Sequence, residues 1–422
     1  MTMNKCLHGA VTLPGSKSES NRVLMVAAYG EFSVLRSPFS VFRSPFSVSQ
    51  AHDTVLLQAL LQKIFAATEA DLVEVDCEDA GTVARFLLPL LCAREGTWLV
   101  TGTERLCQRP MGPLVEALRQ LGAEIDCREK EGFLPLLIHG RPLCGGEVEI
   151  DAGQSSQFVS ALLMAAPMWE KGLRLTVIGN MASKPYVAMT IAVMQQFGAA
   201  VQWQGPIIEV APKPYREASF EVAADWSAAS YWYELMALSE GGSLLLKGLR
   251  PDSLQGDAVV CKWYEQLGVR TVFGPEGATL TKEATLVKEG DAPRHFDFSD
   301  TPDLFPAMFV TCVALHLPAV FKEIKNLSVK ESDRVKSIIT ELNKIYTFIN
   351  IIDNDEIIIE KSSFIDESNH CSMVVFDTHL DHRVAMALAP LTLLFPSATL
   401  DHPEVVAKSY PDYWGEFEAL MQ

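Results

Sequence analysis

The sequence lacks the cysteine and histidine patterns that mark disulfide-rich proteins and metal enzymes. Its 422 residues contain nine cysteines, none of them in a C-x-x-C pair and most of them among apolar neighbours. This distribution predicts reduced core thiols and a cytoplasmic location. No H-E-x-x-H motif, Cys/His cluster or carboxylate run has metal-ligand spacing, so we expect no metal. No G-x-G-x-x-G motif follows a predicted strand, so we expect no dinucleotide cofactor.

An excess of positive charge and a membrane-spanning segment are also missing. The chain has 35 basic and 53 acidic residues, a net charge of -18, which argues against a nucleic acid or an anionic membrane as partner. The N-terminus has no signal-peptide hydrophobic region, so we expect no export. One apolar stretch, residues 304–321, is interrupted by two prolines and a histidine, which favours a buried helix over a membrane span.

An internal repeat organises the sequence. A polar start, an amphipathic helix, a glycine and a short β-branched run recur with landmarks at Gly122, Gly198, Gly268 and Tyr346, spaced by 76, 70 and 78 residues. Each glycine is typical of a left-handed helix end, and the run after it of a strand. The length favours two domains, and the repeat predicts an α/β protein built from copies of one module; chance recurrence in an ordinary α/β chain is the alternative.

Two segments do not fit this repeat. Residues 36–49 read RSPFSVF-RSPFSVS, a near-duplication that is typical of a local loop insertion. Residues 345–370 are rich in Ile, Asn and Asp, unlike the sequence around them. Neither segment predicts a function.

The first candidate site is LPGSKSESNR, near the N-terminus. Its Pro-Gly pair ends an apolar strand, and Ser16 or Ser18 can cap the helix that follows. Lys17 and Arg22 would then lie beside the helix-start N–H groups, an arrangement that stabilises a phosphate or a carboxylate. An ordinary capped helix with solvated charges is the other interpretation. The motif is not a P-loop, because it lacks the first glycine of that pattern.

Three later segments repeat this arrangement of polar residues before an apolar helix. They are Gly81, Thr82 and Arg85 in DAGTVAR, then Ser155, Ser156 and Gln157, and then Ser183, Lys184 and Tyr186. Any one of them reads most simply as a helix cap. Because equivalent ends of repeated modules tend to face a common surface, the four together predict an anion-binding surface.

Candidate carboxylates come from the later half of the chain. Asp303 precedes a buried helix, and Glu331 lies among basic residues. Nearby cations favour the charged form of a carboxylate while burial opposes it, so either residue could transfer protons. A helix cap for Asp303 and a solvated helix start for Glu331 are the structural alternatives. His382 and Arg383 open a further helix, and Lys408 precedes another.

Nine motifs occur in order along nearly the whole chain. They are LPGSKSESNR, DAGTVAR, RPMGPLVEALRQLGA, SSQFVSALLMAAP, SKPYVAMT, TPDLFPAM, VKESDR, LDHRVAMALAPL and AKSYPDYW. Together they resemble the 5-enolpyruvylshikimate-3-phosphate synthase family of enolpyruvyl transferases, which belongs to the shikimate pathway of aromatic amino acid and chorismate biosynthesis. The resemblance implies an α/β fold of two domains, each of three βαβαββ units around a cleft. The implied domains are 15–225, mainly for shikimate-3-phosphate, and 1–14 with 226–422, for the carboxylates and part of the phosphoenolpyruvate site.

The resemblance also implies two sets of binding residues. The shikimate-3-phosphate set is Lys17, Ser18, Arg22, Ser155, Ser156, Gln157, Ser183, Tyr186, Asp303, Asn326 and Lys330. The phosphoenolpyruvate set is Lys17, Gly81, Thr82, Arg85, Arg109, Gln157, Glu331, Arg334, Arg383 and Lys408. Such cations would give a globally acidic protein a concentrated basic site. The implied protein is a monomer that needs no cofactor.

The family's reaction adds the 5-hydroxyl of shikimate-3-phosphate to C2 of phosphoenolpyruvate, protonates C3, and then eliminates phosphate. We expect Asp303 to be the base for the hydroxyl, and Glu331 and Lys17 to move the C3 proton, with His382 as a further catalytic candidate. The cations of the phosphoenolpyruvate set would hold that substrate and stabilise developing charge.

The chain departs from the family pattern at three places: Asp79 replaces the usual Asn of NAGT, the duplication changes a connection, and a glycine is missing after Lys344. Two other functions stay open. One is the sister transferase that acts on a UDP-sugar, although the Lys-Asn pairing and loop cysteine of that enzyme are missing here. The other is a non-catalytic binding protein, against which the retained Lys17, Asp303 and Glu331 argue.

Overall fold

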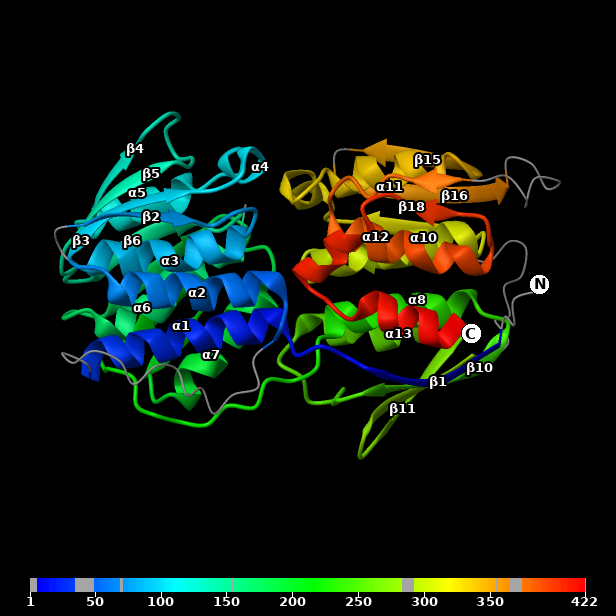
Figure 1. Ribbon diagram of the computed structural model, residues 1–422, viewed down its shortest axis with the longest axis horizontal. Helices are drawn as coiled ribbons and strands as arrows, with labels where there is room; N and C mark the ends of the chain where they lie inside the picture. The colour runs from blue at the N-terminus through cyan, green and yellow to red at the C-terminus, as the bar shows by residue number, and fades with distance from the viewer. Residues whose placement is uncertain are drawn as a thin grey trace. The chain divides into compact units, whose positions relative to one another are not determined.

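The computed structural model describes residues 6–34, 49–68, 71–153, 155–282, 292–353, 355–364 and 374–421 (Figure 1). Its contacts divide the chain into two compact units. The continuous unit is Ser16–Val222, and the split unit joins Met1–Gly15 to Ala223–Gln422. Each unit has its own hydrophobic core. The sequence predicts domains of residues 15–225 and of residues 1–14 with 226–422, and these limits remain a prediction.

The continuous unit contains two four-stranded sheets and the helices that pack on them. Its helices are α1 (Lys17–Val34), α2 (His52–Ala66), α3 (Gly81–Ala93), α4 (Glu104–Cys107), α5 (Gly112–Gln120), α6 (Ser156–Ala165) and α7 (Lys184–Gln196). Its strands are β2 (Leu72–Asp76), β3 (Gly96–Thr101), β4 (Glu124–Cys127), β5 (Leu136–Gly140), β6 (Gly146–Asp151), β7 (Leu173–Ile178), β8 (Val201–Gln204) and β9 (Ile207–Val210).

The split unit contains two further four-stranded sheets and one short two-stranded sheet. Its helices are α8 (Trp226–Leu238), α9 (Val260–Glu265), α10 (Phe305–Ala314), α11 (Arg334–Leu342), α12 (His382–Leu388) and α13 (Tyr413–Met421). Its strands are β1 (Cys6–Thr12), β10 (Gly241–Lys247), β11 (Val269–Gly274), β12 (Gly277–Lys282), β13 (Arg294–Asp297), β14 (Ala319–Lys322), β15 (Tyr346–Asp353), β16 (Glu356–Phe364), β17 (Val375–Phe376) and β18 (Thr399–Leu400).

The four larger sheets share one plan. Their strand orders are β2-β3-β5-β4, β6-β7-β9-β8, β1-β10-β12-β11 and β13-β14-β16-β15. In each sheet the first two strands are parallel and the last two form an antiparallel hairpin, which gives the chain order βαβαββ. The repeated α/β module expected from the sequence is therefore confirmed. The N-terminal strand β1 pairs with β10, although more than 200 residues separate them in the sequence.

Each sequence repeat is the second helix of one of these modules and the strand after it: α5–β4, α7–β8, α9–β11 and α11–β15. The three landmark glycines are left-handed, with φ of 97°, 91° and 82° at Gly122, Gly198 and Gly268. At the end of α5 the N–H of Ala123 donates to the carbonyl of Leu118 at 2.9 Å, which closes the helix. The predicted helix ends are confirmed.

The atypical segment after Lys344 forms a β-hairpin whose register shifts between Ile349 and Asn350. No glycine is needed there, because Asn343 ends α11 in the right-handed conformation and the chain enters β15 at Tyr346. Strand β16 pairs with both β15 and β14, so this segment completes its sheet. Residues 365–370 and all but the last residue of the 36–49 duplication lie outside the described residues.

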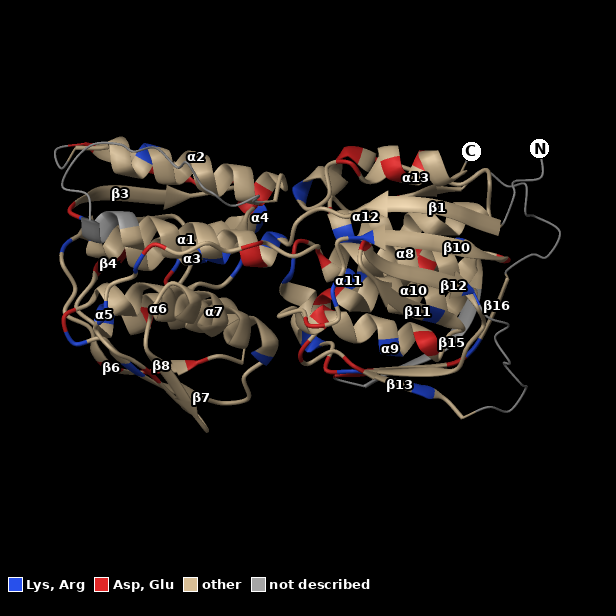
Figure 2. Ribbon diagram, turned by 90° about the horizontal axis from the view of Figure 1, so that it is seen from below, with Lys and Arg blue, Asp and Glu red and all other residues tan. Residues whose placement is uncertain are grey.

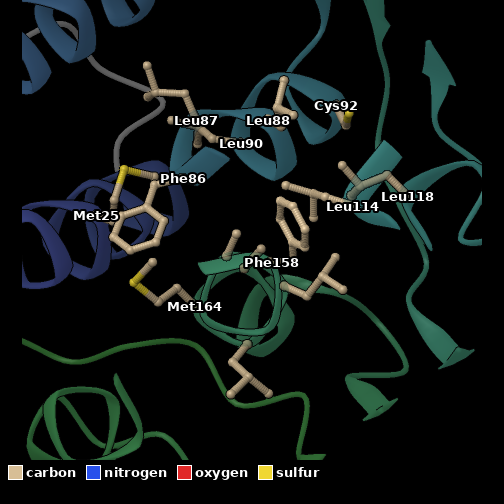
Figure 3. Packing of buried hydrophobic residues seen from close by; sticks show 14 of the residues in the cluster. Met25, Phe86, Leu87, Leu88, Leu90, Cys92, Leu114, Leu118, Phe158 and Met164 are labelled. Atoms are coloured by element: carbon tan, nitrogen blue, oxygen red, sulfur yellow. The ribbon is translucent and has the colours of Figure 1, made fainter. Parts of the chain in front are cut away.

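The central helices α6 and α10 are almost entirely buried. Helices α6 and α10 contain no charged residue (Figure 2). Every residue of α10 is buried. A helix that is apolar all round belongs in a core. In the continuous unit Phe86 of α3 and Phe158 of α6 lie in one apolar cluster with Met25 and Leu114 (Figure 3). Truncating such a phenylalanine to alanine costs about 3–5 kcal/mol.

Residues 304–321 form α10 and lead into β14, as the buried-helix interpretation predicts. Within the described residues, no helix has the length and apolar character needed to cross a membrane.

Candidate active site

Helices α3, α6 and α7 of the continuous unit each place a side chain against Arg22 of α1. Its Nε donates to the hydroxyl of Thr190 on α7 at 2.7 Å, and its Nη2 donates to the hydroxyl of Ser160 on α6 at 3.4 Å. The guanidinium carbon lies 5.3 Å from the ring centroid of Phe86 on α3 and 5.6 Å from that of Tyr186 on α7. Four helices of the continuous unit therefore contribute to the surroundings of this guanidinium.

The charge of Arg22 is buried among neutral partners. The residue is 2% exposed, and its third hydrogen bond runs from Nη1 to the carbonyl of Ser18 at 2.8 Å. Burial lowers the pKa of Arg22 to about 10, although Tyr186 and Glu19 partly oppose this, so the guanidinium is still charged at neutral pH. A buried cation whose hydrogen-bond partners are neutral is stabilised by an incoming anion.

A second pair of arginines lies at the N-terminus of α3. Arg85 donates to the amide oxygen of Gln157 at 2.7 Å and to the carbonyl of Pro110 at 3.2 Å. A Cβ placed on Gly81 would lie 2.6 Å from Nη1 of Arg109 and 3.0 Å from Nη1 of Arg85. Both guanidinium groups thus reach the first residue of the helix, and only glycine leaves room for them. Arg85 and Arg109 are 4% and 7% exposed. Two guanidinium groups at a helix start are suited to bind phosphate.

The serines near these helix starts fall into two groups. Ser16 and Ser155 cap α1 and α6, accepting from the N–H groups of Glu19 at 3.4 Å and Gln157 at 3.3 Å. The capping interpretation is right for these two. It is wrong for Ser183, which precedes α7 in the left-handed conformation with φ of 58° and makes no side-chain cap. Strain of this kind occurs where the backbone is held for a purpose other than helix stability.

Lys17 makes an ion pair that the sequence did not predict. Its Nζ lies 3.0 Å from Oδ2 of Asp53, in the first turn of α2. The side chains are 14% and 4% exposed. The amine at the start of α1 is therefore held in place by a nearly buried carboxylate.

The split unit contains a cluster of opposite character around Arg334. This residue is 1% exposed and contacts three carboxylates, Asp303 at 2.9 Å, Glu331 at 2.7 Å and Asp381 at 3.0 Å. Burial disfavours its charge, but these carboxylates outweigh burial and raise the pKa of Arg334 above its ordinary value. All the nitrogens of one guanidinium are used to hold three acids together.

Asp303 is shared between two arginines. Its Oδ1 accepts from Arg334, and its Oδ2 accepts from Nη2 of Arg383 at 2.7 Å. Burial would raise the pKa of Asp303, but Arg383, Lys330 and Arg334 outweigh burial and hold that pKa well below its usual range. Asp303 lies inside the 3₁₀ turn Pro302–Leu304, and its carboxylate forms these two ion pairs. The solvated interpretation of Glu331 is wrong, because its side chain is 15% exposed and paired.

The turn that precedes α12 is fixed by Asp381. Its Oδ1 accepts from the N–H of Arg383 at 2.9 Å, which caps α12, and its Oδ2 accepts from Ser332 at 3.1 Å. His382 is 1% exposed, and its Nδ1 lies 3.7 Å from Oδ1 of Asp381. Within the described residues, no group of three or more His, Cys, Asp or Glu has metal-binding geometry.

The family model described as EPSP synthase (3-phosphoshikimate 1-carboxyvinyltransferase) matches residues 47–417. The chain belongs to the EPSP synthase family.

Curated relatives of this family agree with the family model. The chain is 38% identical over 411 residues to the 3-phosphoshikimate 1-carboxyvinyltransferase of Bacteroides fragilis, covering 97% of this chain and 94% of that protein. It is 34% identical to the protein of that name from Syntrophobacter fumaroxidans, covering 97% and 96%. The resemblance stated from the nine motifs is confirmed.

Solved structures confirm the fold. The EPSP synthase of Acinetobacter baumannii matches with a TM-score of 0.72 at 21% identity, covering 99% of this chain and 96% of that one. The enolpyruvyl transferase NikO of Streptomyces tendae matches with a TM-score of 0.69 at 16% identity, again over 99% and 96%. The chain therefore has the two-domain enolpyruvyl transferase fold.

The EPSP synthase motifs are brought together within each unit. Described contacts in the continuous unit join Arg22 to Ser18 and Tyr186, Arg85 to Gln157, and Gln157 to Thr82, while Arg85 and Arg109 both lie close to Gly81. In the split unit they join Arg334 to Asp303 and Glu331, and Arg383 to Asp303. The positive charge of Lys330 acts on Asp303. Asn326 lies in the 3₁₀ turn Lys325–Val329. Lys408 is 7% exposed. The roles expected for these residues in EPSP synthase chemistry stay predictions.

Sequence reasoning missed Asp53 and Asp381. The signal for Asp381 was present, since Asp precedes a helix start in LDHR and is a preferred cap. No local signal marks Asp53, because its partner Lys17 lies 36 positions earlier in the sequence.

Proposed function

We propose that this chain transfers the enolpyruvyl group of phosphoenolpyruvate to the 5-hydroxyl of shikimate-3-phosphate, releasing phosphate, and that the two arginine clusters carry out this work. Family membership and the names of the relatives support the activity. The observation that carries the residue assignment is Arg22, a charged group that is 2% exposed and hydrogen-bonded to neutral partners. Such a group favours binding of an anionic substrate over solvent.

The binding roles are the two sets of residues that the family resemblance implies. We assign shikimate-3-phosphate to Lys17, Ser18, Arg22, Ser155, Ser156, Gln157, Ser183, Tyr186, Asp303, Asn326 and Lys330. We assign phosphoenolpyruvate to Lys17, Gly81, Thr82, Arg85, Arg109, Gln157, Glu331, Arg334, Arg383 and Lys408. The phosphate of phosphoenolpyruvate would take the start of α3, where Arg85 and Arg109 meet at Gly81.

In the addition step the hydroxyl oxygen bonds to C2 of phosphoenolpyruvate, the hydroxyl proton passes to a base, and C3 gains a proton. Asp303 is the base, because its neighbours keep it ionised in the absence of substrate. Those same neighbours make it a weak base. When the anionic groups of phosphoenolpyruvate bind Arg383 and Arg334, they offset the cationic charge, and the basicity of Asp303 rises.

In the elimination step the C2–O bond to phosphate breaks and C3 loses a proton. Glu331 and Lys17 move this proton, and His382 takes part in the same transfers. The guanidinium groups stabilise the charge that develops on the leaving phosphate. No cofactor is needed, since each step uses only proton transfer and a phosphate leaving group.

Phosphate release in the presence of both substrates tests the proposal. Asp303→Ala and Lys17→Met should lower kcat by about 100-fold or more, the usual contribution of a proton-transfer group. The exposed Asp252→Ala and Lys213→Met are matched controls that should leave turnover unchanged. A wild-type chain that releases no phosphate would refute the activity. Near-normal turnover in Asp303→Ala or Lys17→Met would refute its assigned role.

We extend the proposal to a monomer located in the cytoplasm. Every cysteine in the described ranges is a free thiol, and Cys77, Cys92 and Cys312 are buried. Free buried thiols are typical of proteins kept in a reducing compartment. Sedimentation should give one species near the chain mass of 46.5 kDa, and a stable dimer would overturn this part.

A further inference from the structure

We infer that Glu341 and His379 are positioning residues, whose hydrogen bond holds the turn before α12 in shape and so places Arg383 where phosphoenolpyruvate binds. This inference rests on the proposed function, which assigns Arg383 to that substrate. Glu341 lies in the last turn of α11, and His379 directly precedes the LDHR motif. None of the nine motifs includes either residue. We call the pair the Glu341–His379 clasp.

Glu341 is a buried carboxylate that contacts three donors. It is 1% exposed. Its Oε1 lies 3.1 Å from Nε2 of His379, and its Oε2 accepts from the N–H of Asp377 at 2.8 Å. Oε2 also lies 2.6 Å from Nζ of Lys344. An ionised carboxylate only accepts hydrogen bonds, so Nε2 of His379 is the donor in the clasp.

The turn that the clasp holds has a strained backbone. His379 and Leu380 are consecutive residues in the left-handed region, each with φ of 51°. Neither is glycine, which adopts this region freely. Within the turn the N–H of Asp381 donates to the carbonyl of Thr378 at 2.9 Å, and the N–H of Thr378 donates to Asp401 at 2.7 Å. Strain of this kind persists only where the surroundings fix the backbone.

Helix α11 fixes the two ends of this turn. Arg334 and Glu341 are seven residues apart in α11, which is about two helical turns, so they lie on the same face of the helix. Arg334 binds Asp381 at the end of the turn, with 3.0 Å between Nε and Oδ2. Glu341 binds Asp377 and His379 at its start. The turn is therefore held along the length of α11.

The end of the turn determines where Arg383 lies. Oδ1 of Asp381 accepts from the N–H of Arg383 at 2.9 Å, so the position of Asp381 sets the start of α12. Nη2 of Arg383 then donates to Asp303 at 2.7 Å. Without the clasp, the left-handed backbone can relax, and the relaxation displaces Asp381 and Arg383 together. A displacement of about 1 Å in a residue that orients a substrate weakens its action substantially.

Stability alone does not account for a histidine at this position. The carboxylate of Glu341 already has the N–H of Asp377 and the ammonium of Lys344 as partners. The side chain of His379 is 27% exposed, so it adds little buried area. Glycine would adopt the same backbone without strain. The hydrogen bond of the ring is therefore the feature that distinguishes histidine here.

Two variants of His379 separate the hydrogen bond from the bulk of the ring. His379→Gln keeps an N–H donor, whereas His379→Leu keeps bulk and removes the donor. In a phosphate-release assay His379→Leu should raise the KM for phosphoenolpyruvate about fivefold, with kcat and the KM for shikimate-3-phosphate within about twofold of wild type. His379→Gln should restore the wild-type KM. An unchanged KM in His379→Leu, or the same rise in His379→Gln, would overturn the inference.

His316 provides a matched control in the same unit. It is also left-handed, with φ of 56°, and half-buried, and its Nδ1 lies 3.1 Å from the hydroxyl of Ser362. His316→Leu should leave both KM values unchanged, even if it lowers the unfolding temperature. A rise in the KM for phosphoenolpyruvate equal to that of His379→Leu would overturn the inference, because general destabilisation would then explain both.

Two further measurements keep the test decisive. If His379→Leu does not fold, His379→Gly decides, since glycine keeps the left-handed backbone and lacks the donor; an unchanged KM there would overturn the inference. If wild type releases no phosphate, the proposed function fails, and amide hydrogen exchange of the full chain still tests the clasp. Residues 377–383 should exchange about tenfold faster in His379→Leu than in wild type and His379→Gln. Equal exchange in all three would overturn the clasp.

Discussion

Two buried arginines in this molecule have opposite surroundings. Arg22 in the continuous unit is 2% exposed and bonded to two hydroxyls and a carbonyl, while Arg334 in the split unit is 1% exposed and bonded to three carboxylates. Burial lowers the pKa of Arg22 to about 10, whereas the carboxylates raise the pKa of Arg334 above its ordinary value. The same side chain thus becomes an anion receptor in one unit and a clamp on acids in the other.

This difference explains how an acidic protein can act on two anions. Positive charge that is already paired with carboxylates attracts a substrate less strongly, because the anion must compete with those carboxylates. Positive charge among neutral partners is available. We therefore expect the two clusters to respond differently to mutation and to pH.

The largest effect should follow from Arg334→Gln. This change leaves Asp303, Glu331 and Asp381 without their shared cation, which should lower the free energy of unfolding by about 3–5 kcal/mol. In wild type the lowered pKa of Asp303 means that its stabilising effect is present above about pH 4 and is lost as pH falls. In the variant the unpaired acids should reverse this trend. Urea unfolding at pH 5 and pH 8 measures both, and a variant that is as stable as wild type at pH 8 would contradict the clamp.

Arg22→Met should affect stability less. The change removes a buried charge. The hydrogen-bond partners that it leaves behind are the neutral groups of Thr190, Ser160 and the Ser18 carbonyl, and none of them is a carboxylate. The free energy of unfolding should fall by no more than about 2 kcal/mol. The difference between pH 5 and pH 8 should match that of wild type. A loss as large as that of Arg334→Gln would remove the contrast between the clusters.

Gly81→Ala should weaken phosphoenolpyruvate binding. Its Cβ would lie 2.6 Å from Arg109 and 3.0 Å from Arg85, so both guanidinium groups must move. We expect the KM for phosphoenolpyruvate to rise about tenfold, equivalent to 1.4 kcal/mol, with a smaller change in kcat. The matched control is Gly112→Ala at the start of α5, where the nearest atom would be 3.7 Å away. Equal KM values in the two variants would refute this role for Gly81.

The smallest effect concerns Glu234, a buried acid of α8 outside both clusters. Burial raises the pKa of Glu234 well above its ordinary value, and neither oxygen accepts a hydrogen bond from the described residues. Because the folded-state pKa exceeds the unfolded one, the stability that this group contributes is full below about pH 4.5 and is lost as pH rises. Glu234→Gln should therefore be about 1 kcal/mol more stable than wild type at pH 8. Thermal unfolding at pH 5 and 8 checks this, and a gain limited to pH 5 would contradict the sign.

The sequence predicted the fold well because the module repeats. Helix, glycine and strand recur four times, and local chemistry specifies each element: glycine at the end of α5, serine at the start of α6. The positive helix starts could be predicted for the same reason. The motifs also predicted that Arg22 and Arg334 lie at sites that bind anions, although they did not predict the contacts of either side chain.

The partners of these arginines could not be predicted from local sequence. Arg22 contacts Thr190, 168 positions later, and Arg383 contacts Asp303 across 80 positions. Which acid pairs with which cation depends on how the helices pack against one another. The hydrophobic pattern of the sequence does not specify these partners. Lys17 with Asp53 and Ser227 with Asp257 were missed for this reason.

Binding of shikimate-3-phosphate to the full-length chain tests the central claim most directly. Titration calorimetry at pH 7 should show binding to wild type and to Gly112→Ala, and a loss of about 100-fold in affinity in Arg22→Met, since a buried charge-assisted pair is worth about 3 kcal/mol. Equal affinity in wild type and Arg22→Met would contradict the account, because the buried arginine with neutral partners would then not be the anion receptor.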